Sequence, residues 1–509
     1  MLDSVVAGLP LFLTVHTVLL VALGVVFGLV VGALPGLGPL MGMILVLPFA
    51  IDLPAIAAIG LLSAIFVGGS CGGSVSAILL GIPGTPLAAA TLFDGYPMAR
   101  RGRGADAVGI AISASALGGL FGGAVLIVLT PLLAEFASGF TAPEYTALAI
   151  TGLITVAVVS EGSVVKGLLA GCFGLLIATI GADQFSNGFR FTFGSYHLLD
   201  GFHIVAIVVG LFAIPEMAWQ VLRTDLDEKI DLPPIRVGLR AVSLTLRHWA
   251  NVLRSSALGA FFGAIPGASG VASSFVAYAA AKALARPEER YGEGAEGGVV
   301  ATESANNATV GGTFVPTLAL GIPGDAGAAV LLGALIILGV FPGPALFANR
   351  PEIVGGIFLV YLLANALLLV VGIAMTPLFA YVLRIRGSHL IPIVLLLCAV
   401  GTFALQASIF DLWAMLGFGL VGILFKAARY PLAPVVIGVI LGPLLENNYR
   451  RSLLISRDGH WIFLERPISA VLLAIDVLLI FGVVVYGVRQ ARRRRAEPTG
   501  KMTSSNIPD

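Results

Sequence analysis

The chain has 509 residues, of which 58% are hydrophobic and only 11% charged, and its formal net charge is +1. Soluble domains carry about a quarter charged residues, and no soluble core can bury this much apolar surface, so the composition excludes a soluble globular protein. The net charge points to no class of partner, and we expect none among nucleic acids.

Apolar runs near 20 residues long recur along the chain, and each can cross the roughly 30 Å of bilayer hydrocarbon. The runs are long rather than alternating, which favours helices over a transmembrane barrel. We predict an all-α polytopic membrane protein with about 11 or 12 transmembrane helices, and re-entrant hairpins where runs are short or broken. The runs lie near 11–33, 38–50, 54–69, 71–92, 105–134, 143–159, 164–182, 202–222, 249–283, 298–322, 326–341, 352–381, 389–425 (long enough for two helices), 431–446 and 467–488.

The N-terminus, MLDSVVAGLP, lacks the basic segment of a secretory signal, so we expect the first run to be a retained helix. The three cysteines, Cys71, Cys172 and Cys398, are scattered through apolar sequence. This spacing suits neither a disulfide framework nor a metal cluster, and we expect these side chains to serve in packing.

Polar segments divide the chain. Residues 223–248 form the most polar internal stretch and predict a cytoplasmic linker between a first transmembrane half, 1–222, and a second, 249–488. The tail 489–509 begins RQARRRR, and the positive-inside rule predicts that it is cytoplasmic. Residues 446–466 are predicted to be a second amphipathic surface segment, whose side of the membrane the sequence leaves open.

Two Pro-Gly motifs occur in each half. GALPG, ending at Gly36, returns as GAIPG, ending at Gly267, 231 positions later. LGIPG, ending at Gly84, returns at Gly324, 240 positions later. A shared order of two such breaks about 50 residues apart indicates an internal duplication, the usual design of secondary transporters.

The basic residues predict that the two halves are inverted. The turn after the second break of the first half carries Arg100, Arg101 and Arg103, whereas its counterpart, FPGPALFANRPE, carries only Arg350. Between the two breaks the bias reverses: FAIDLPA has no Lys or Arg, and AKALARPEERYGEG has three. If basic loops stay inside, the second half is the first turned over, and its site meets that of the first half near the bilayer midplane.

A Pro-Gly pair inside an apolar run ends one helix and allows another to begin. In hydrocarbon such a break is tolerated only where it is buried in protein or lines a wet cavity. The start of a half-helix offers free N–H groups and a positive dipole to a carboxylate, and the end of one offers carbonyl groups to Na⁺.

Small polar residues surround the four breaks, and hydroxyl and amide groups can serve a carboxylate and a cation together. Gly, Ser and Thr can equally do no more than let membrane helices pack closely, but adjacent asparagines in an apolar run are costly unless they are satisfied. The predicted substrate-binding residues are Gly36, Gly38, Ser70, Ser74, Gly84, Thr85, Gly267, Ser269, Asn306, Asn307 and Gly324. The predicted cation-coupling residues are Glu303, Thr309 and Asp325, with a possible Na⁺ near Asn307, Thr309 and Asp325.

At these motifs the sequence resembles the large membrane subunit of tripartite tricarboxylate transporters, the TctA family. The resemblance rests on GALPGLGPLMGMILVLPFA, GIPGTPLAAATLFDGYPMARRG, GAIPGASG, ESANNATVGG and GIPGDAGAAVLLGALIILGVFPGP, and it continues to Gly459. It implies a bacterial inner-membrane permease that works with a small membrane subunit and a periplasmic binding protein. It also implies uptake of citrate-like or other organic carboxylates, driven by a Na⁺ or H⁺ gradient and without a cofactor.

One residue departs from the family pattern. After the second GIPG the family usually has a small polar residue, and this chain has Asp325. In the stretch that follows, the family often has a polar or His residue where this chain has the apolar IILGVF. An ionised Asp325 would repel a carboxylate substrate, so our hypothesis is that Asp325 takes part in cation or proton coupling.

Two other classes stay open from the residues alone. An ion or solute channel is the second interpretation, although matched breaks enclose a site more naturally than they line a continuous pore. An intramembrane enzyme is the third, but the six His and three Cys show no spacing for a nucleophile–base pair or a metal cluster. We therefore expect a transporter rather than an enzyme.

Overall fold

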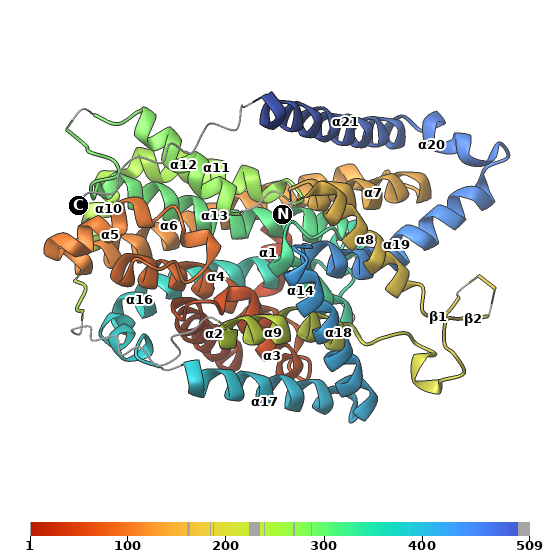
Figure 1. The fold of residues 1–509 in the computed structure, drawn as a ribbon, viewed down its shortest axis with the longest axis horizontal. Coiled ribbons are helices and arrows are strands. Elements are labelled where there is room, and N and C mark those ends of the chain that lie inside the picture. Colours follow the sequence, from red (N-terminus) through yellow and green to blue (C-terminus); the bar gives the residue numbers. More distant parts are fainter. Residues whose placement is uncertain are drawn as a thin grey trace, which may run out of the picture.

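The computed structural model describes residues 2–159, 163–183, 185–186, 188–222, 235–238, 240–267, 270–286, 288–385 and 387–496. Helices dominate these residues, and the strands among them are β1 (Gly181–Ala182) and β2 (Phe189–Arg190), which pair antiparallel (Figure 1). The predicted all-α class is confirmed.

The helices follow the two predicted halves in order. The first half contains α1 (Leu2–Phe12), α2 (Val15–Ala33), α3 (Gly38–Ala50), α4 (Ala55–Leu80), η1 (Pro86–Ala88), α5 (Leu92–Met98), η2 (Ala99–Arg103), α6 (Gly104–Ala137), α7 (Ala142–Val159), α8 (Val164–Ala178), η3 (Tyr196–Leu198) and α9 (Ile204–Leu222). The remainder contains α10 (Arg240–Arg247), α11 (Trp249–Ala264), α12 (Gly270–Ala283), α13 (Glu296–Leu320), α14 (Ala326–Ile337), α15 (Pro344–Asn349), α16 (Pro351–Val382), α17 (Gly387–Gln406), α18 (Ile409–Ala427), α19 (Ala433–Ile455), η4 (Gly459–Trp461), α20 (Ile462–Glu465) and α21 (Pro467–Ala496).

Seven helical segments in the described residues are long and apolar enough to cross a bilayer: α2, α4, α5–α6, α9, α16, α17 and α18. This confirms a polytopic membrane protein, although seven is fewer than the 11 or 12 crossings predicted. The breaks account for part of the difference, because α3, α12 and α14 have only 13, 14 and 12 residues, and a simple crossing needs about 20.

The duplication is visible in the packing of glycines. Gly28 and Gly32 of α2 lie directly on the backbone of α4, against Ile65 and Gly69. In the second half, Gly259 and Gly263 of α11 lie in the same way on α13, against the Ala305 and Thr309 carbonyls. The pair α2–α4 and the pair α11–α13 therefore have the same parallel, close-packed geometry.

Equivalent helices of the two halves run in opposite directions. Where α4 and α13 cross, Phe66 lies near Phe314, the Ser70 carbonyl accepts from Asn306, and Ser74 donates to Glu303. Residue numbers therefore increase along α4 as they decrease along α13, so the two helices run antiparallel. Helices α6 and α16 also run antiparallel, because Gly119 packs on Asn365 and Ile112 on Gly372. These contacts show the inverted arrangement that the basic loops predicted.

The crossing of α4 and α13 has two unlike sides. With the offset of 240 residues, Phe66 corresponds to Asn306 and Ser74 corresponds to Phe314. Consequently one side of the crossing holds the aromatic pair Phe66–Phe314, whose ring centroids are 6.3 Å apart. The other side holds the polar pair Ser70–Asn306 and the carboxyl of Glu303.

The helices form a core group and two flanking groups. Helices α1–α6 and α10–α16 pack mainly on one another and make up the core group. Helices α9, α17 and α18 form one flanking group, and α7, α8, α19, α20 and α21 form the other. Since all four Pro-Gly breaks lie in the core group, the core group carries the hairpins.

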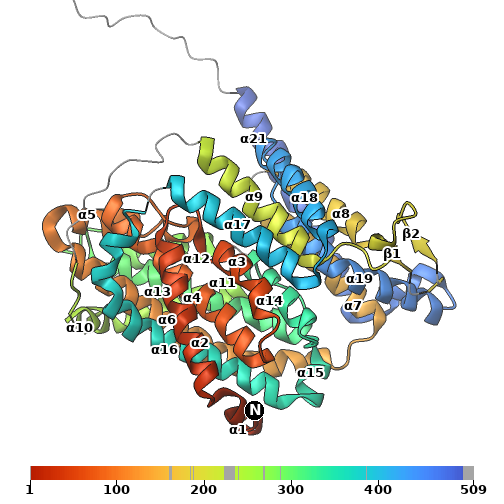
Figure 2. The same ribbon diagram turned by 90° about the horizontal axis from the view of Figure 1, so that it is seen from below.

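The two ends of the molecule differ. Figures 1 and 2 both place α5 and α10 at one end and the β1–β2 hairpin at the opposite end. The described part of the predicted linker contributes to the first end, because α10 forms within it and Ala241 packs on Gly109 of α6. Residues 489–496 of the predicted tail continue α21, and the rest of the tail lies outside the described residues.

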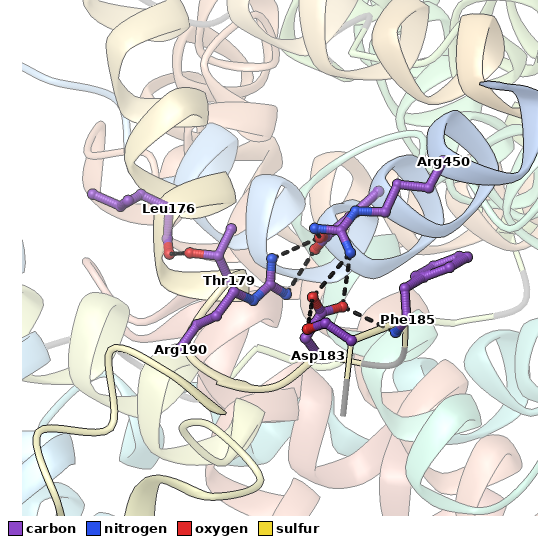
Figure 3. A network of polar contacts seen from close by, with 8 residues as sticks. Leu176, Thr179, Asp183, Phe185, Arg190 and Arg450 are labelled. Carbon is purple, nitrogen blue, oxygen red and sulfur yellow. Dashed lines mark hydrogen bonds and ion pairs between the residues drawn. The ribbon is translucent and has the colours of Figure 1, made fainter. Parts of the chain in front are cut away.

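An ion-pair network holds the β1–β2 hairpin to α19 (Figure 3). Arg190 donates to both oxygens of Glu446 at 2.6 and 3.0 Å. Arg450 donates to both oxygens of Asp183 at 2.8 and 3.0 Å and lies 2.9 Å from Glu446. The Ser186 hydroxyl, the Phe185 N–H and the Arg450 guanidinium hold the pKa of Asp183 well below its usual range. This network places segment 446–466 at the hairpin end.

Candidate functional site

The two breaks of each half meet each other. In the first half the Gly36 N–H donates to the Gly84 carbonyl at 3.3 Å, and in the second the Gly267 N–H donates to the Gly324 carbonyl at 2.7 Å. Gly36 and Gly267 have φ values of 88° and 81°, which favour glycine. The four breaks therefore form two equivalent tip pairs, Gly36–Gly84 and Gly267–Gly324, and the predicted meeting of the two halves' sites stays a prediction.

Each tip pair lies against a flanking helix. A Cβ at Gly36 would lie 2.6 Å from Nε2 of Gln220 on α9, and a Cβ at Gly267 would lie 2.7 Å from the Val156 Cα on α7. The missing side chains let the tips approach the flanking groups this closely. Of the predicted substrate-binding glycines, Gly36 and Gly267 thus lie where the hairpin-bearing core meets its two flanks, and Gly84 and Gly324 pack inside the core group.

The residue after each second break has a different environment in the two halves. Thr85 is buried against Gly38 and Gly73, and its hydroxyl has no hydrogen-bond partner among the described residues. Asp325 is only partly buried, and its Oδ1 accepts the Ala328 N–H at 2.7 Å as the N-cap of α14. Capping accounts for a carboxylate at this position, and the coupling role of Asp325 stays a prediction.

Glu303 is the most enclosed of the predicted cation-coupling residues. Its side chain is 0% exposed. Oε1 accepts from the hydroxyls of Ser74 on α4 and Thr91 beside α5, each at 2.5 Å, and Oε2 accepts from Ser115 of α6 at 2.9 Å. Three hydroxyls of the first half therefore bind the carboxyl of a second-half helix, and the Asn306 side chain of α13 also hydrogen-bonds to it.

The two asparagines after Glu303 are buried with unused polar atoms. Asn306 donates to the Ser70 carbonyl at 3.0 Å, but its Oδ1 and the Ser70 hydroxyl find no partner among the described residues. The Nδ2 and Oδ1 atoms of Asn307 also have no hydrogen-bond partner among the described residues. The backbone carbonyl of Asn307 accepts from the Tyr361 hydroxyl at 3.3 Å. Buried polar groups without partners are rare and costly, so these atoms indicate a place for a polar ligand.

The residues predicted to surround a Na⁺ have separate partners. The Thr309 and Ser273 hydroxyls pair at 2.7 Å. Asn307 is two positions away on the same helix, so its side chain leaves α13 in another direction. No hydrogen bond or ion pair among the described residues joins Asn307, Thr309 and Asp325, and a shared Na⁺ shell stays a prediction. Ser269 lies outside the described residues.

Three residues of this region were absent from the sequence prediction. Thr91 and Ser115 bind the Glu303 carboxyl, and Asp94 of α5 is buried under the loop before α13. Thr91 and Ser115 stand in apolar runs, where such residues commonly serve in helix packing. Asp94 belongs to FDGYPMARRG and could have been recognised as an acidic residue beside the second break.

The site as a whole offers neutral polar atoms and the carboxyls of Glu303, Asp94 and Asp325. Its free atoms come from Thr85, Ser70, Asn306 and Asn307. Such groups donate to a carboxylate or accept from a protonated group without a fixed positive charge. Cys71 and Cys398 are buried as expected for packing, whereas Cys172 is exposed.

Comparison with known proteins agrees with this architecture. Residues 18–437 match the "Tripartite tricarboxylate transporter TctA family". The chain is 34% identical over 496 residues, 97% of its own length and 98% of the relative's, to the "Uncharacterized 52.8 kDa protein in TAR-I ttuC' 3'region" of Agrobacterium vitis. It is 33% identical over 235 residues, 46% of its own length and 97% of the relative's, to the "Uncharacterized protein in TAR-II ttuC' 3'region" of the same organism. The chain belongs to the tripartite tricarboxylate transporter TctA family.

Proposed function

We propose that this chain is the large permease subunit of a binding-protein-dependent secondary transporter that imports organic di- or tricarboxylates with an ion gradient. The observation that carries the proposal is the pairing of the four breaks. Two inverted halves each bring their breaks together, at Gly36–Gly84 and Gly267–Gly324. Inverted repeats with broken helices at a shared interface are the design by which secondary transporters bind substrate.

The three helix groups support alternating access as the mechanism. The core group carries both tip pairs, and each pair presents a glycine, Gly36 or Gly267, to a flanking helix. Contacts made by backbone and small residues let one packed body slide against another without interlocking side chains. The core group is the moving unit in this mechanism, and the two flanking groups are the scaffold.

The proposed partners and orientation come from the family and the charges. A small membrane subunit and a periplasmic solute-binding protein complete the transporter in the bacterial inner membrane. Arg100, Arg101 and Arg103 lie beside α5, so the positive-inside rule assigns the α5 end to the cytoplasm. Helix α21 begins beside α20 at the hairpin end and runs toward the other end (Figure 1), which gives a cytoplasmic C-terminus.

Reconstitution tests the proposal. The permease and its small subunit are reconstituted into proteoliposomes, and the binding protein is added outside. Uptake of labelled di- and tricarboxylates is then measured under Na⁺ and H⁺ gradients. We expect saturable uptake that requires the binding protein and one of the gradients. Substrate-independent current would show a channel instead, and absence of uptake for every carboxylate would refute the proposal.

A matched pair of variants links the result to the tips. Gly36→Ala introduces a Cβ beside Gln220 at a positive φ, and it is expected to abolish uptake. Gly417→Ala adds the same methyl group on α18, where no heavy atom lies within 4 Å. The Gly417→Ala variant is expected to transport normally. Equal uptake by the two variants would show that the tip pairs have no role in transport.

A further inference from the structure

An open cavity of about 500 Å³ lies in one flanking group, between the start of α7 and the last turns of α19. Figure 1 shows α19 and α20 at the hairpin end of the molecule. The cavity walls come from three residues within 141–145 and four within 448–455. None of the four Pro-Gly breaks contributes to these walls, so the cavity is separate from the candidate substrate site.

The cavity lies where three apolar helices reach the surface of the bilayer. The apolar run of α7 begins after Glu144, that of α19 ends before Glu446, and that of α21 begins after Arg466. The Arg466 guanidinium donates to the Thr141 hydroxyl at 3.1 Å, which brings the starts of α7 and α21 to one level. Trp461, in the segment between α19 and α21, is 65% exposed, and tryptophan is enriched at membrane–water interfaces. The cavity therefore opens at the bilayer surface, on the periplasmic side in the proposed orientation.

One arginine of the cavity wall has no partner. Arg450 binds Asp183 and lies 2.9 Å from Glu446. Arg451, the next residue, lines the cavity, is exposed, and makes no hydrogen bond or ion pair with the part of the chain that the structure describes. No lining residue is acidic. Because a guanidinium group binds the oxygens of a phosphate or carboxylate through two parallel hydrogen bonds, the cavity suits an anion.

The carboxyl beside the cavity is already engaged. Glu144 is buried, and its Oε2 accepts the Thr141 N–H at 2.8 Å and the Thr141 hydroxyl at 2.6 Å. This arrangement is a capping box at the start of α7. Oε1 of Glu144 lies 3.7 Å from the Arg466 guanidinium. The charges of Glu144 and Arg466 therefore balance each other, and Arg451 gives the cavity one net positive charge.

Apolar side chains share the cavity wall with Arg451. Leu454 and Ile455 lie about one helical turn from Arg451 on α19 and are 75% and 67% exposed. The wall also holds the Tyr145 hydroxyl and the Asn448 side-chain oxygen, neither of which has a hydrogen-bond partner among the described residues. A di- or tricarboxylate needs two or three cations and gains nothing from apolar contacts. A monoanion that carries apolar chains matches all of these groups.

We propose that this cavity binds an anionic phospholipid with a monoanionic phosphodiester and an uncharged, hydroxyl-bearing headgroup, as in phosphatidylglycerol. The phosphodiester binds the Arg451 guanidinium, the headgroup hydroxyls face Asn448 and Tyr145, and the acyl chains follow Leu454 and Ile455. Phosphatidylethanolamine fits less well, because its ammonium group needs an acid and the neighbouring carboxyl is engaged. The lipid joins α7 to α19 and fastens this flanking group to the leaflet. The site goes beyond the proposed transport function, and only the choice of leaflet rests on the proposed orientation.

Native mass spectrometry of the full chain in detergent tests the site, with phosphatidylglycerol and phosphatidylethanolamine of the same acyl chains as probes. The wild type is expected to retain one phosphatidylglycerol at concentrations at which phosphatidylethanolamine is lost. Arg451→Gln is expected to weaken this binding about ten-fold or more, because it removes a charge-assisted contact. Arg457→Gln is the matched control, since Arg457 is exposed in the same segment, has no ion-pair partner among the described residues and does not line the cavity. Equal phosphatidylglycerol binding by the two variants, or equal retention of the two lipids by the wild type, would overturn the proposal.

Thermal unfolding separates a lipid from a free anion. Phosphatidylglycerol is expected to raise the melting temperature of the wild type and Arg457→Gln but not of Arg451→Gln, and inorganic phosphate and citrate are expected to change none of the three. Stabilisation by phosphate or citrate that disappears in Arg451→Gln would show a site for free anions and overturn the lipid. Because Arg451 is exposed and unpaired within the described residues, Arg451→Gln is expected to melt like the wild type without lipid. Carboxylate uptake enters neither measurement, so a negative result leaves the proposed function standing.

Discussion

Replacing Gly32 by alanine tests the close packing of α2 on α4. The added Cβ would lie 2.2 Å from the Gly69 carbonyl oxygen, whereas real Cβ contacts are not shorter than 3.0 Å. The two helices must therefore separate by at least 3.0 − 2.2 = 0.8 Å at this point. The neighbour is backbone and cannot rotate away, so the whole helix has to move.

The energy follows from two opposing effects. Overpacking of a well-packed site costs about 1–3 kcal/mol, and the better helix propensity of alanine returns about 1 kcal/mol. Gly417→Ala, which meets nothing within 4 Å, receives only the second effect. The free energy of unfolding of Gly32→Ala is therefore expected to lie about 1–3 kcal/mol below that of Gly417→Ala.

Unfolding of both variants in detergent micelles, followed by circular dichroism, measures this difference. Gly263→Ala provides an internal check, because its Cβ would lie 2.3 Å from the Thr309 carbonyl oxygen in the second half. Similar losses for Gly32→Ala and Gly263→Ala are expected if the halves are packed alike. A Gly32→Ala protein as stable as Gly417→Ala would refute the reasoning.

Three further predictions concern the cap of α14 and the β1–β2 hairpin. Asp325→Ala is expected to lower the free energy of unfolding by about 1 kcal/mol and Asp325→Asn by only a few tenths, because Asn also caps helices; equal losses would contradict capping. Below pH about 4, the usual carboxyl pKa, the stabilisation from the depressed pKa of Asp183 is lost as pH falls toward its folded-state value. Pepsin cleavage within 181–202 is therefore expected to accelerate steeply below that pH, and a flat rate would count against it. Arg450→Gln is expected to release the hairpin at neutral pH and speed trypsin cleavage after Arg190, whereas unchanged cleavage would show that the ion pairs do not hold it.

Much of the architecture could be predicted because it depends on residue types with few alternatives. Pro-Gly pairs in apolar runs have little use in lipid except as buried breaks, and their two offsets exposed the duplication. The basic loops predicted the inversion, which the crossing of α4 and α13 shows directly. The number of crossings was less predictable, because polar residues in α13 and short helices such as α3 depart from a simple span.

The site was harder to predict because small polar residues have two uses in membrane helices. Thr91 and Ser115 hold the Glu303 carboxyl, but in sequence they cannot be told apart from packing residues. For Asp325, in contrast, the sequence suggested a functional role where the structure shows a structural one. Its position directly before an apolar helical run is a common N-cap signal, and the sequence interpretation considered only its charge.

The unlike sides of the α4–α13 crossing bear on the energy landscape of the whole protein. In a duplicated, inverted protein, exchanging the conformations of the halves converts an outward-facing state into an inward-facing one. Identical halves would make these two states equal in free energy. Here an aromatic pair, Phe66–Phe314, stands where the other side has Asn306 and Ser74. In the transport cycle proposed above, this difference makes the two states unequal in free energy, so one of them is preferred in the absence of substrate.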